Sequence, residues 1–140
     1  MASDTLRTVE LDRTGAGTFR ATNVRGGTLD VASDSSPTFT PVELLLVAIG
    51  ACTGMDVDAI TARRAQPDGF AITVDADKIR DAGGNRLTDI AVTFRVAFPD
   101  GDAGDAARAI LPEAVRRSHD RLCTVSRTVQ LGSPVTTTVQ

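Results

Sequence analysis

Hydrophobic and polar residues alternate in three short segments of the first third of the chain, residues 8–12, 18–21 and 28–31. Alternation with a period of two is typical of strands that bury one face. Glycine-containing segments separate the three, and such segments favour turns. We therefore expect three short antiparallel strands.

The same alternation returns in residues 70–76 and 90–96. Residues 81–85 lie between them with the sequence Asp-Ala-Gly-Gly-Asn, which suits a turn with positive φ and predicts a β-hairpin. The tail, residues 135–139, is rich in threonine and valine and predicts a last strand.

A long helix is predicted between these β segments. Thr40 is a good N-cap and Pro41 suits the first turn. Residues 44–55 are apolar or small on every side, so we expect this half of the helix to be the buried axis of the core. Residues 66–69, with a proline and a glycine, end the helix, which places Cys52 near its middle.

The segment 103–122 has a helical composition, and Pro112 is expected to break it or to open a second helix. Cys123 follows directly, and residues 124–129 predict a short helix. The pattern as a whole indicates an α+β protein. At 140 residues the chain fits one domain, residues 1–140, with one core.

The composition argues against two classes of partner, nucleic acids and membranes. The net charge is −3 without a basic cluster, and tryptophan and tyrosine are absent, which argues against nucleic acid as a partner. The first four residues lack the basic and apolar regions of a signal peptide, and the apolar stretches are too short to span a bilayer. We expect a cytoplasmic protein with no membrane partner.

The two cysteines are the candidates for chemistry. They lie 71 positions apart and in a reducing compartment would rest as thiols. Small residues flank Cys52, so another element can approach the helix closely there. Cys123 lies between a segment rich in arginine and a helix start, and both features stabilise a thiolate. The alternative from the residues alone is that both cysteines only pack.

A metal site is not expected. His119, the only histidine, precedes Cys123 by four residues, and the pair suggests Cys-His catalysis or, with Asp56, metal binding. Stable zinc sites use more cysteine and histidine ligands than this chain offers. We therefore expect neither a metal nor another bound cofactor, and we expect His119 to be a surface residue.

Two motifs resemble those of a known family. Residues 40–57, with the sequence TPVELLLVAIGACTGMDV, resemble the central helix of the OsmC/Ohr family, the osmotically inducible and organic hydroperoxide resistance proteins. Residues 123–128, CTVSRT, are similar to its second-cysteine motif, with Thr124 where many relatives have proline. The resemblance implies an OsmC-like fold, with antiparallel sheets around a long buried central helix in an intertwined homodimer.

The resemblance also implies a thiol-dependent peroxidase for organic hydroperoxides. Cys52 would attack the peroxide, Cys123 would close a disulfide with it, and an external dithiol would reduce that disulfide. Family peroxidases add an arginine and a glutamate, for which Arg25 and Glu43 are the candidates here. Their glutamate directly follows the proline, whereas this chain has Val42 there and Glu43 one place later. The rival hypothesis is a non-catalytic redox-sensing or small-molecule-binding protein.

Overall fold

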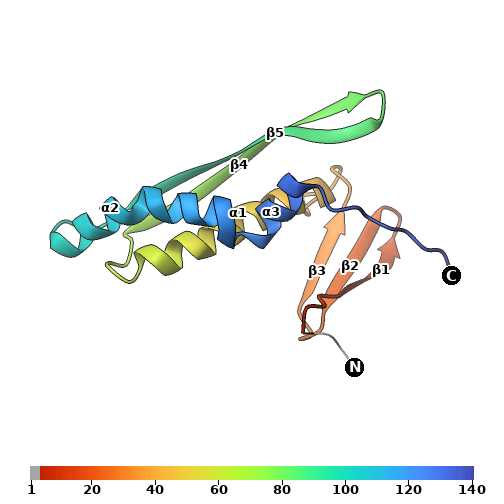
Figure 1. Cartoon of the computed structure of the whole chain (residues 1–140). Coiled ribbons are helices and arrows are strands. Elements are labelled where there is room, and N and C mark those ends of the chain that lie inside the picture. The colour runs from red at the N-terminus through yellow and green to blue at the C-terminus, as the bar shows by residue number, and fades with distance from the viewer. Residues whose placement is uncertain (1–3) are drawn as a thin grey trace. The chain divides into compact units, whose positions relative to one another are not determined.

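The computed structural model describes residues 4–140, and in this part of the chain it has two antiparallel sheets and three α-helices (Figure 1). Backbone contacts divide the chain into two compact units, Met1–Leu45 and Leu46–Gln140, and each is described by itself. The α+β class and the antiparallel sheets are confirmed. The single domain over residues 1–140 stays a prediction.

The first unit contains a three-stranded meander, with β1 (Val9–Gly15), β2 (Thr18–Asn23) and β3 (Thr28–Ala32) in sequence order. The turn between β2 and β3 includes Gly26, whose φ of 88° lies in the left-handed region that glycine adopts without a steric cost. All three strands predicted from the alternation are confirmed.

Helix α1 (Pro41–Thr61) begins with a capping box. The backbone N–H of Glu43 donates to Thr40 Oγ1 at 3.2 Å, and the N–H of Thr40 donates to the Glu43 carboxylate at 2.9 Å. These reciprocal bonds satisfy two N–H groups that a helix start otherwise leaves without a partner in the helix. The predicted helix start is confirmed, and Glu43 is part of the reason for it.

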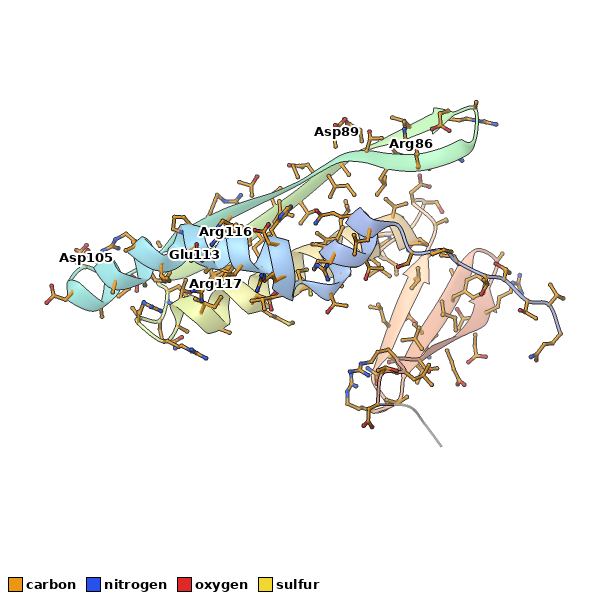
Figure 2. The ribbon with its side chains drawn as sticks, in the orientation of Figure 1. Arg86, Asp89, Asp105, Glu113, Arg116 and Arg117 are labelled. Carbon is orange, nitrogen blue, oxygen red and sulfur yellow. The ribbon has the colours of Figure 1, made fainter. Side chains whose placement is uncertain are left out.

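The second unit contains a long hairpin of β4 (Gly69–Asp81) and β5 (Gly84–Ala97). Both strands extend beyond the segments predicted from alternation because pairing continues to the turn. There Arg86, which is labelled in Figure 2, forms an ion pair with Asp81 at 2.7 Å. The predicted hairpin is confirmed and is longer than its apolar segments.

An irregularity divides this hairpin. The register of pairing shifts between Asp75 and Asp77, and on the facing strand Asp89 has a φ of 53° (Figure 2). A bulge of this kind bends a strand and increases its twist. The half of β4 that precedes the shift is the half that packs against α1.

Two glycines bring α1 and β4 together. A Cβ atom on Gly50 would lie 2.8 Å from Val74 Cγ2, and one on Gly54 would lie 2.5 Å from Ile72 Cδ1. Gly50 and Gly54 are one turn apart, so they form a single flat face on the helix. The expectation that small residues around Cys52 permit a close approach is confirmed.

The prediction that the first half of α1 is buried on every side is wrong for the single chain. Ile49, Thr53 and Val57 are buried, but the exposed fractions of Val47 and Met55 are 47% and 71%. An apolar helix is buried all round only where other elements cover every side. Within the second unit the hairpin and the C-terminal helices cover only part of it.

Helix α2 (Asp102–Arg117) continues through Pro112, so the predicted break is wrong. A proline inside a helix removes one backbone hydrogen bond and costs about 3 kcal/mol. Ala107 and Ala114, on either side of Pro112, are fully buried. Packing of α2 on both sides of the proline offsets that cost.

A single π-helical turn, η1 (Ser118–Leu122), joins α2 to the short helix α3 (Thr124–Leu131). The N–H of Cys123 donates to the carbonyl oxygen of Ser118 at 2.9 Å, which is the i to i−5 bond of a π turn. The short helix is confirmed. The π turn replaces the last turn of the helix predicted to reach Leu122.

The predicted terminal strand is wrong for the single chain, since residues 133–140 form no strand within the described residues. Val135 and Val139 are 90% and 93% exposed. Strand propensity reflects packing on a sheet more than a preference of the backbone, and no described strand pairs with this tail.

The prediction that the apolar stretches are too short to span a bilayer is wrong for α1, which by length and composition could cross a membrane, with a mean hydropathy of 1.6. The core helix of a soluble protein passes the same test. Here Gly50 and Gly54 pack on β4, and Thr53 bonds to Ser118. We therefore describe α1 as a core helix.

Candidate active site

Cys52 is half-buried in the middle of α1. It lies two residues from each of the two glycines that contact β4. Two residues correspond to a rotation of about 200° around a helix, so the Cys52 side chain is on the side away from β4. On that side it meets the start of α3.

Cys123 is fully buried and is the N-cap residue of α3. Its sulfur accepts the backbone N–H of Ser126 at 3.4 Å, and its thiol donates to Ser126 Oγ at 3.2 Å. The π turn that precedes it fixes its backbone through the bond to Ser118. The sulfur therefore occupies the place where serine or aspartate oxygens usually cap a helix.

The two sulfurs and a carboxylate oxygen of Asp56 all lie within 4.8 Å of one another. Both cysteines are free thiols. A disulfide requires an S–S bond of about 2.05 Å, so bond formation from this arrangement requires a movement of the side chains. The sequence alone does not bring these three groups together, and the fold does.

Burial raises the pKa of the Cys52 thiol above its usual value, and the backbone N–H of Val125 opposes this shift by stabilising the thiolate. The neighbouring Cys123 and Asp56 both add to the increase. The N–H of Val125 belongs to the first turn of α3, as does that of Ser126. The start of this helix therefore provides a hydrogen bond to each of the two sulfurs.

A chain of hydroxyl groups fixes Asp56. Ser118 Oγ donates to Asp56 Oδ2 at 2.8 Å and lies 2.7 Å from Thr53 Oγ1. A serine hydroxyl has one hydrogen, so Thr53 is the donor to Ser118. Ser118 is fully buried and Thr53 is 6% exposed. This chain ties α1 to the first residue of the π turn.

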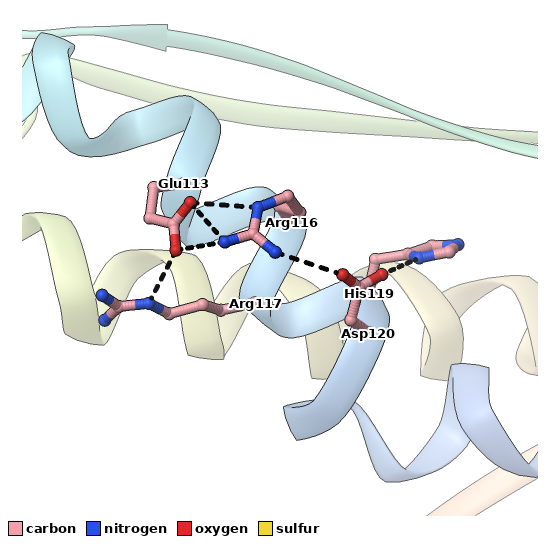
Figure 3. A network of polar contacts seen from close by, with 5 residues as sticks. All are labelled: Glu113, Arg116, Arg117, His119 and Asp120. Atoms are coloured by element: carbon pink, nitrogen blue, oxygen red, sulfur yellow. Dashed lines mark hydrogen bonds and ion pairs between the residues drawn. The ribbon is translucent and has the colours of Figure 1, made fainter.

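Exposed ion pairs surround the same turn (Figure 3). Glu113 accepts hydrogen bonds from Arg116 and Arg117, and Asp120 accepts one from Arg116 and pairs with His119 at 3.0 Å. The pKa of Glu113 is held below its usual range, first by the hydrogen bond from Arg116. These contacts link the end of α2 to η1, although exposed pairs contribute little to stability.

A hollow of about 280 Å³ lies beside Ser126, and neither cysteine is among the residues that line it. Apolar side chains form most of its wall, with Ser126, His119 and Gln130 as polar members. Ser126 is the residue that contacts Cys123. The residues that line the hollow are Ile49, Ile90, Val92, His119, Ser126, Val129 and Gln130.

The remaining residues considered for the site are Glu43, Arg25 and His119, and the contacts described for them do not include either cysteine. Glu43 closes the capping box of α1. Arg25 is exposed at the turn after β2, where its backbone N–H donates to Asn23 Oδ1 at 3.0 Å, and it lines a hollow of about 580 Å³ in the first unit. His119 is exposed, as expected, and its ring contacts Asp120 instead of a cysteine.

Sequence reasoning did not find Ser118, Thr53 or Ser126. The sequence suggests Asp56 only as a possible metal ligand together with His119 and Cys123. The signal for Asp56 was its position one helical turn after Cys52, which places both side chains on one face. The role of Ser118 depends on the π turn, for which the sequence offers no motif.

The family model for OsmC-like protein matches residues 32–138, which include both cysteines and the whole second unit before the last two residues. The chain belongs to the OsmC-like family. The antiparallel sheets and the long helix with its cysteine are those of a member of this family, and the resemblance stated from the two cysteine motifs is confirmed.

Relatives of this OsmC-like protein have similar lengths. Uncharacterized proteins of Mycobacterium tuberculosis and Mycobacterium bovis are 31% identical over 126 residues, which cover 89% of this chain and 90% of theirs. An OsmC-like protein of unknown function from Vibrio cholerae is 12% identical with a TM-score of 0.73, covering 90% of this chain and 94% of that one. The organic hydroperoxide resistance protein OhrB of Bacillus subtilis is 20% identical with a TM-score of 0.58, covering 93% and 94%.

Proposed function

We propose that this OsmC-like protein is a thiol-dependent peroxidase that reduces organic hydroperoxides. The Cys52 thiolate attacks the terminal peroxide oxygen, the O–O bond breaks, and the alkoxide leaves and takes up a proton as an alcohol. Cys52 becomes a sulfenic acid, which the Cys123 thiol attacks to form a disulfide and water. An external dithiol reduces this disulfide and is itself oxidised.

The observation that carries the proposal is the pair of free thiols with sulfurs within 4.8 Å at the start of α3. A thiolate is the reactive form, and N–H groups at a helix start favour it. The burial that raises the pKa of Cys52 acts in the opposite direction. The reaction therefore requires a further positive group or a proton acceptor at the sulfur.

Arg25 is the candidate for this positive group, because the resemblance assigns it to the position of the family arginine. Glu43 is the weaker candidate for the family glutamate, since its carboxylate already accepts the N–H of Thr40. The protein works as a homodimer in the cytoplasm. In support of a second copy, Val47 and Met55 of α1 and the strand-like tail are exposed in the single chain.

The substrate is an organic peroxide. The hollow beside Ser126 is walled mainly by Ile49, Ile90, Val92 and Val129. Apolar walls favour an alkyl or aryl group over water-like hydrogen peroxide. The structural neighbour from Bacillus subtilis is an organic hydroperoxide resistance protein, which supports the same class of substrate.

Peroxide consumption tests the proposal. Purified protein is mixed with cumene hydroperoxide and dihydrolipoamide, and the loss of peroxide is followed for the wild type and for Cys52→Ser. We expect turnover in the wild type and its loss in Cys52→Ser. An absence of turnover in the wild type, with both thiols free by titration, would overturn the proposal.

The second candidate is a redox sensor that is oxidised once and not recycled. The raised pKa of Cys52 and the capping role of Glu43 favour it, as does Val42 in place of the family glutamate. A stoichiometric oxidation by peroxide without dithiol-dependent recycling would identify this candidate.

A further inference from the structure

The sequence led us to expect no metal, but the fold brings three possible ligands together, and we propose that Cys52, Cys123 and Asp56 bind one thiophilic divalent cation, Zn²⁺, in the reduced protein. Asp56 follows Cys52 by one turn of α1, and Cys123 caps α3, so two elements contribute the three ligands. Two thiols, one carboxylate and the cation give a complex after two thiol protons are released. The proposal does not depend on peroxide chemistry.

The distances suit a small cation. The three ligand atoms lie within 4.8 Å of one another. In a tetrahedral zinc site with Zn–S bonds of about 2.3 Å, two sulfurs are roughly 3.8 Å apart. The distance between the two sulfurs therefore needs to shorten by about 1 Å at most, which rotations of the side chains provide.

The surroundings support coordination by Asp56. Ser118 donates to Asp56 Oδ2 and receives the hydrogen of Thr53, so a buried chain of hydroxyls orients the carboxylate. A carboxylate has about four lone-pair positions, and the bond from Ser118 leaves capacity for a metal. Hydrogen bonds of this kind to a ligand are typical of metal sites and raise their affinity.

The donor set selects the metal. Thiolates prefer Zn²⁺ and similar soft ions, whereas Mg²⁺ and Ca²⁺ prefer oxygen ligands only. Three protein ligands leave a fourth position for water or another exchangeable ligand, which is the pattern of catalytic zinc sites and not of closed structural ones. Because the same two sulfurs form the proposed disulfide, metal binding and disulfide formation exclude each other.

Cobalt binding tests this proposal. Protein reduced with a phosphine and kept without oxygen is titrated with Co²⁺, and thiolate-to-cobalt absorption in the near ultraviolet is recorded. We expect one ion per chain, displaced by Zn²⁺ and not by Mg²⁺ or Ca²⁺. The variants Cys52→Ser and Cys123→Ser should lose the absorption, and Asp56→Asn should bind roughly tenfold more weakly or worse.

Asp58→Asn is the matched control, because Asp58 is on the same helix two residues away and is exposed. Equal affinities for wild type and Asp56→Asn, or a full signal in Cys123→Ser, would overturn the site. The wild type provides a second measurement that needs no variant. Zn²⁺ should slow the alkylation of Cys52 and Cys123 together, as located by mass spectrometry, and an unchanged rate at both would contradict the proposal.

Neither measurement contains peroxide. A protein that binds Co²⁺ at these three residues without reducing peroxide supports the metal site and rejects the proposed peroxidase. A protein that reduces peroxide without binding Co²⁺ supports the proposed peroxidase and rejects the metal site.

Discussion

The two cysteines differ in their positions on their helices and in the N–H groups that those helices offer to the sulfur. Cys123 is at the start of α3 and fully buried, and its sulfur accepts a hydrogen bond from the N–H of Ser126 in the helix that it caps. Cys52 lies in the middle of α1, where its own helix has no free N–H to offer, and burial raises the pKa of its thiol. The N–H that stabilises the Cys52 thiolate comes from Val125 of α3. The chemistry of Cys52 therefore depends on a helix to which it does not belong.

The proposed roles, attack by Cys52 and resolution by Cys123, come from the family resemblance and not from this contrast, and the variant Cys123→Ser separates the two steps. We expect steady turnover with dihydrolipoamide to fall by about a hundredfold or more, since the sulfenic acid has no neighbouring thiol to attack it. The first oxidation of Cys52 should persist, and dimedone should trap it as a mass increase on the Cys52 peptide. Dimedone labelling of Cys123 in the variant Cys52→Ser, at a rate equal to that of Cys52, would break the assignment.

The raised pKa of Cys52 predicts a dependence on pH. Below its pKa a thiol gains about tenfold in thiolate for each pH unit, so alkylation of Cys52 should keep rising above pH 8.5, the usual thiol pKa. The protonated form is favoured in the folded state. Its contribution to stability is thus complete below the unfolded pKa and is lost as pH rises through the folded pKa.

The comparison of wild type with Cys52→Ala isolates this effect. The free energy of unfolding of the wild type, relative to that of the variant, should fall between pH 8 and pH 10, as measured by urea denaturation. A difference that stays constant over this range would show that folding leaves the pKa of Cys52 unchanged. An alkylation rate that levels off near pH 7 would show that folding lowers it.

The variant Ser118→Ala tests whether the π turn links the surroundings of Cys52 on α1 to those of Cys123 at the start of α3. The substitution leaves the carboxylate of Asp56 and the hydroxyl of Thr53 without the partner they share, at a cost of about 1–3 kcal/mol for a buried polar group. We expect a lower free energy of unfolding and a slower closure of the Cys52–Cys123 disulfide with diamide. The exposed variant Asp58→Asn is the control, and equal losses in both would remove Ser118 from the site.

The sequence predicts the parts of the molecule that depend on local signals and not the parts that depend on contacts between distant residues. The strands, the hairpin and the start of α1 follow from local signals, namely alternation, turn residues and the pair Thr40 and Glu43. The continuity of α2 through Pro112 depends on buried alanines that only the fold brings together.

Some residues of the site follow from sequence motifs, and others follow only from the fold. Both cysteines could be named from two motifs and their resemblance to a family. Ser118 could not, since its contact with Asp56 spans 62 positions and requires one π turn between α2 and α3. The tail has strand propensity but no described partner strand, and propensity alone does not decide its structure.

Substitutions of Glu43 are expected to have the smallest effect. They separate a role of this residue in capping α1 from a role in peroxide reduction. Glu43→Ala removes the acceptor for the Thr40 N–H and should lower the free energy of unfolding by about 1 kcal/mol. Glu43→Gln keeps a side-chain oxygen in the capping box, so its stability should stay near that of the wild type, and urea denaturation measures both. If capping is its role, peroxide turnover of Glu43→Gln should also match the wild type. A large loss of turnover in Glu43→Gln at unchanged stability would instead show that the Glu43 carboxylate takes part in peroxide reduction, as a proton acceptor or as the partner of a cation, since a negative charge would not by itself stabilise the Cys52 thiolate.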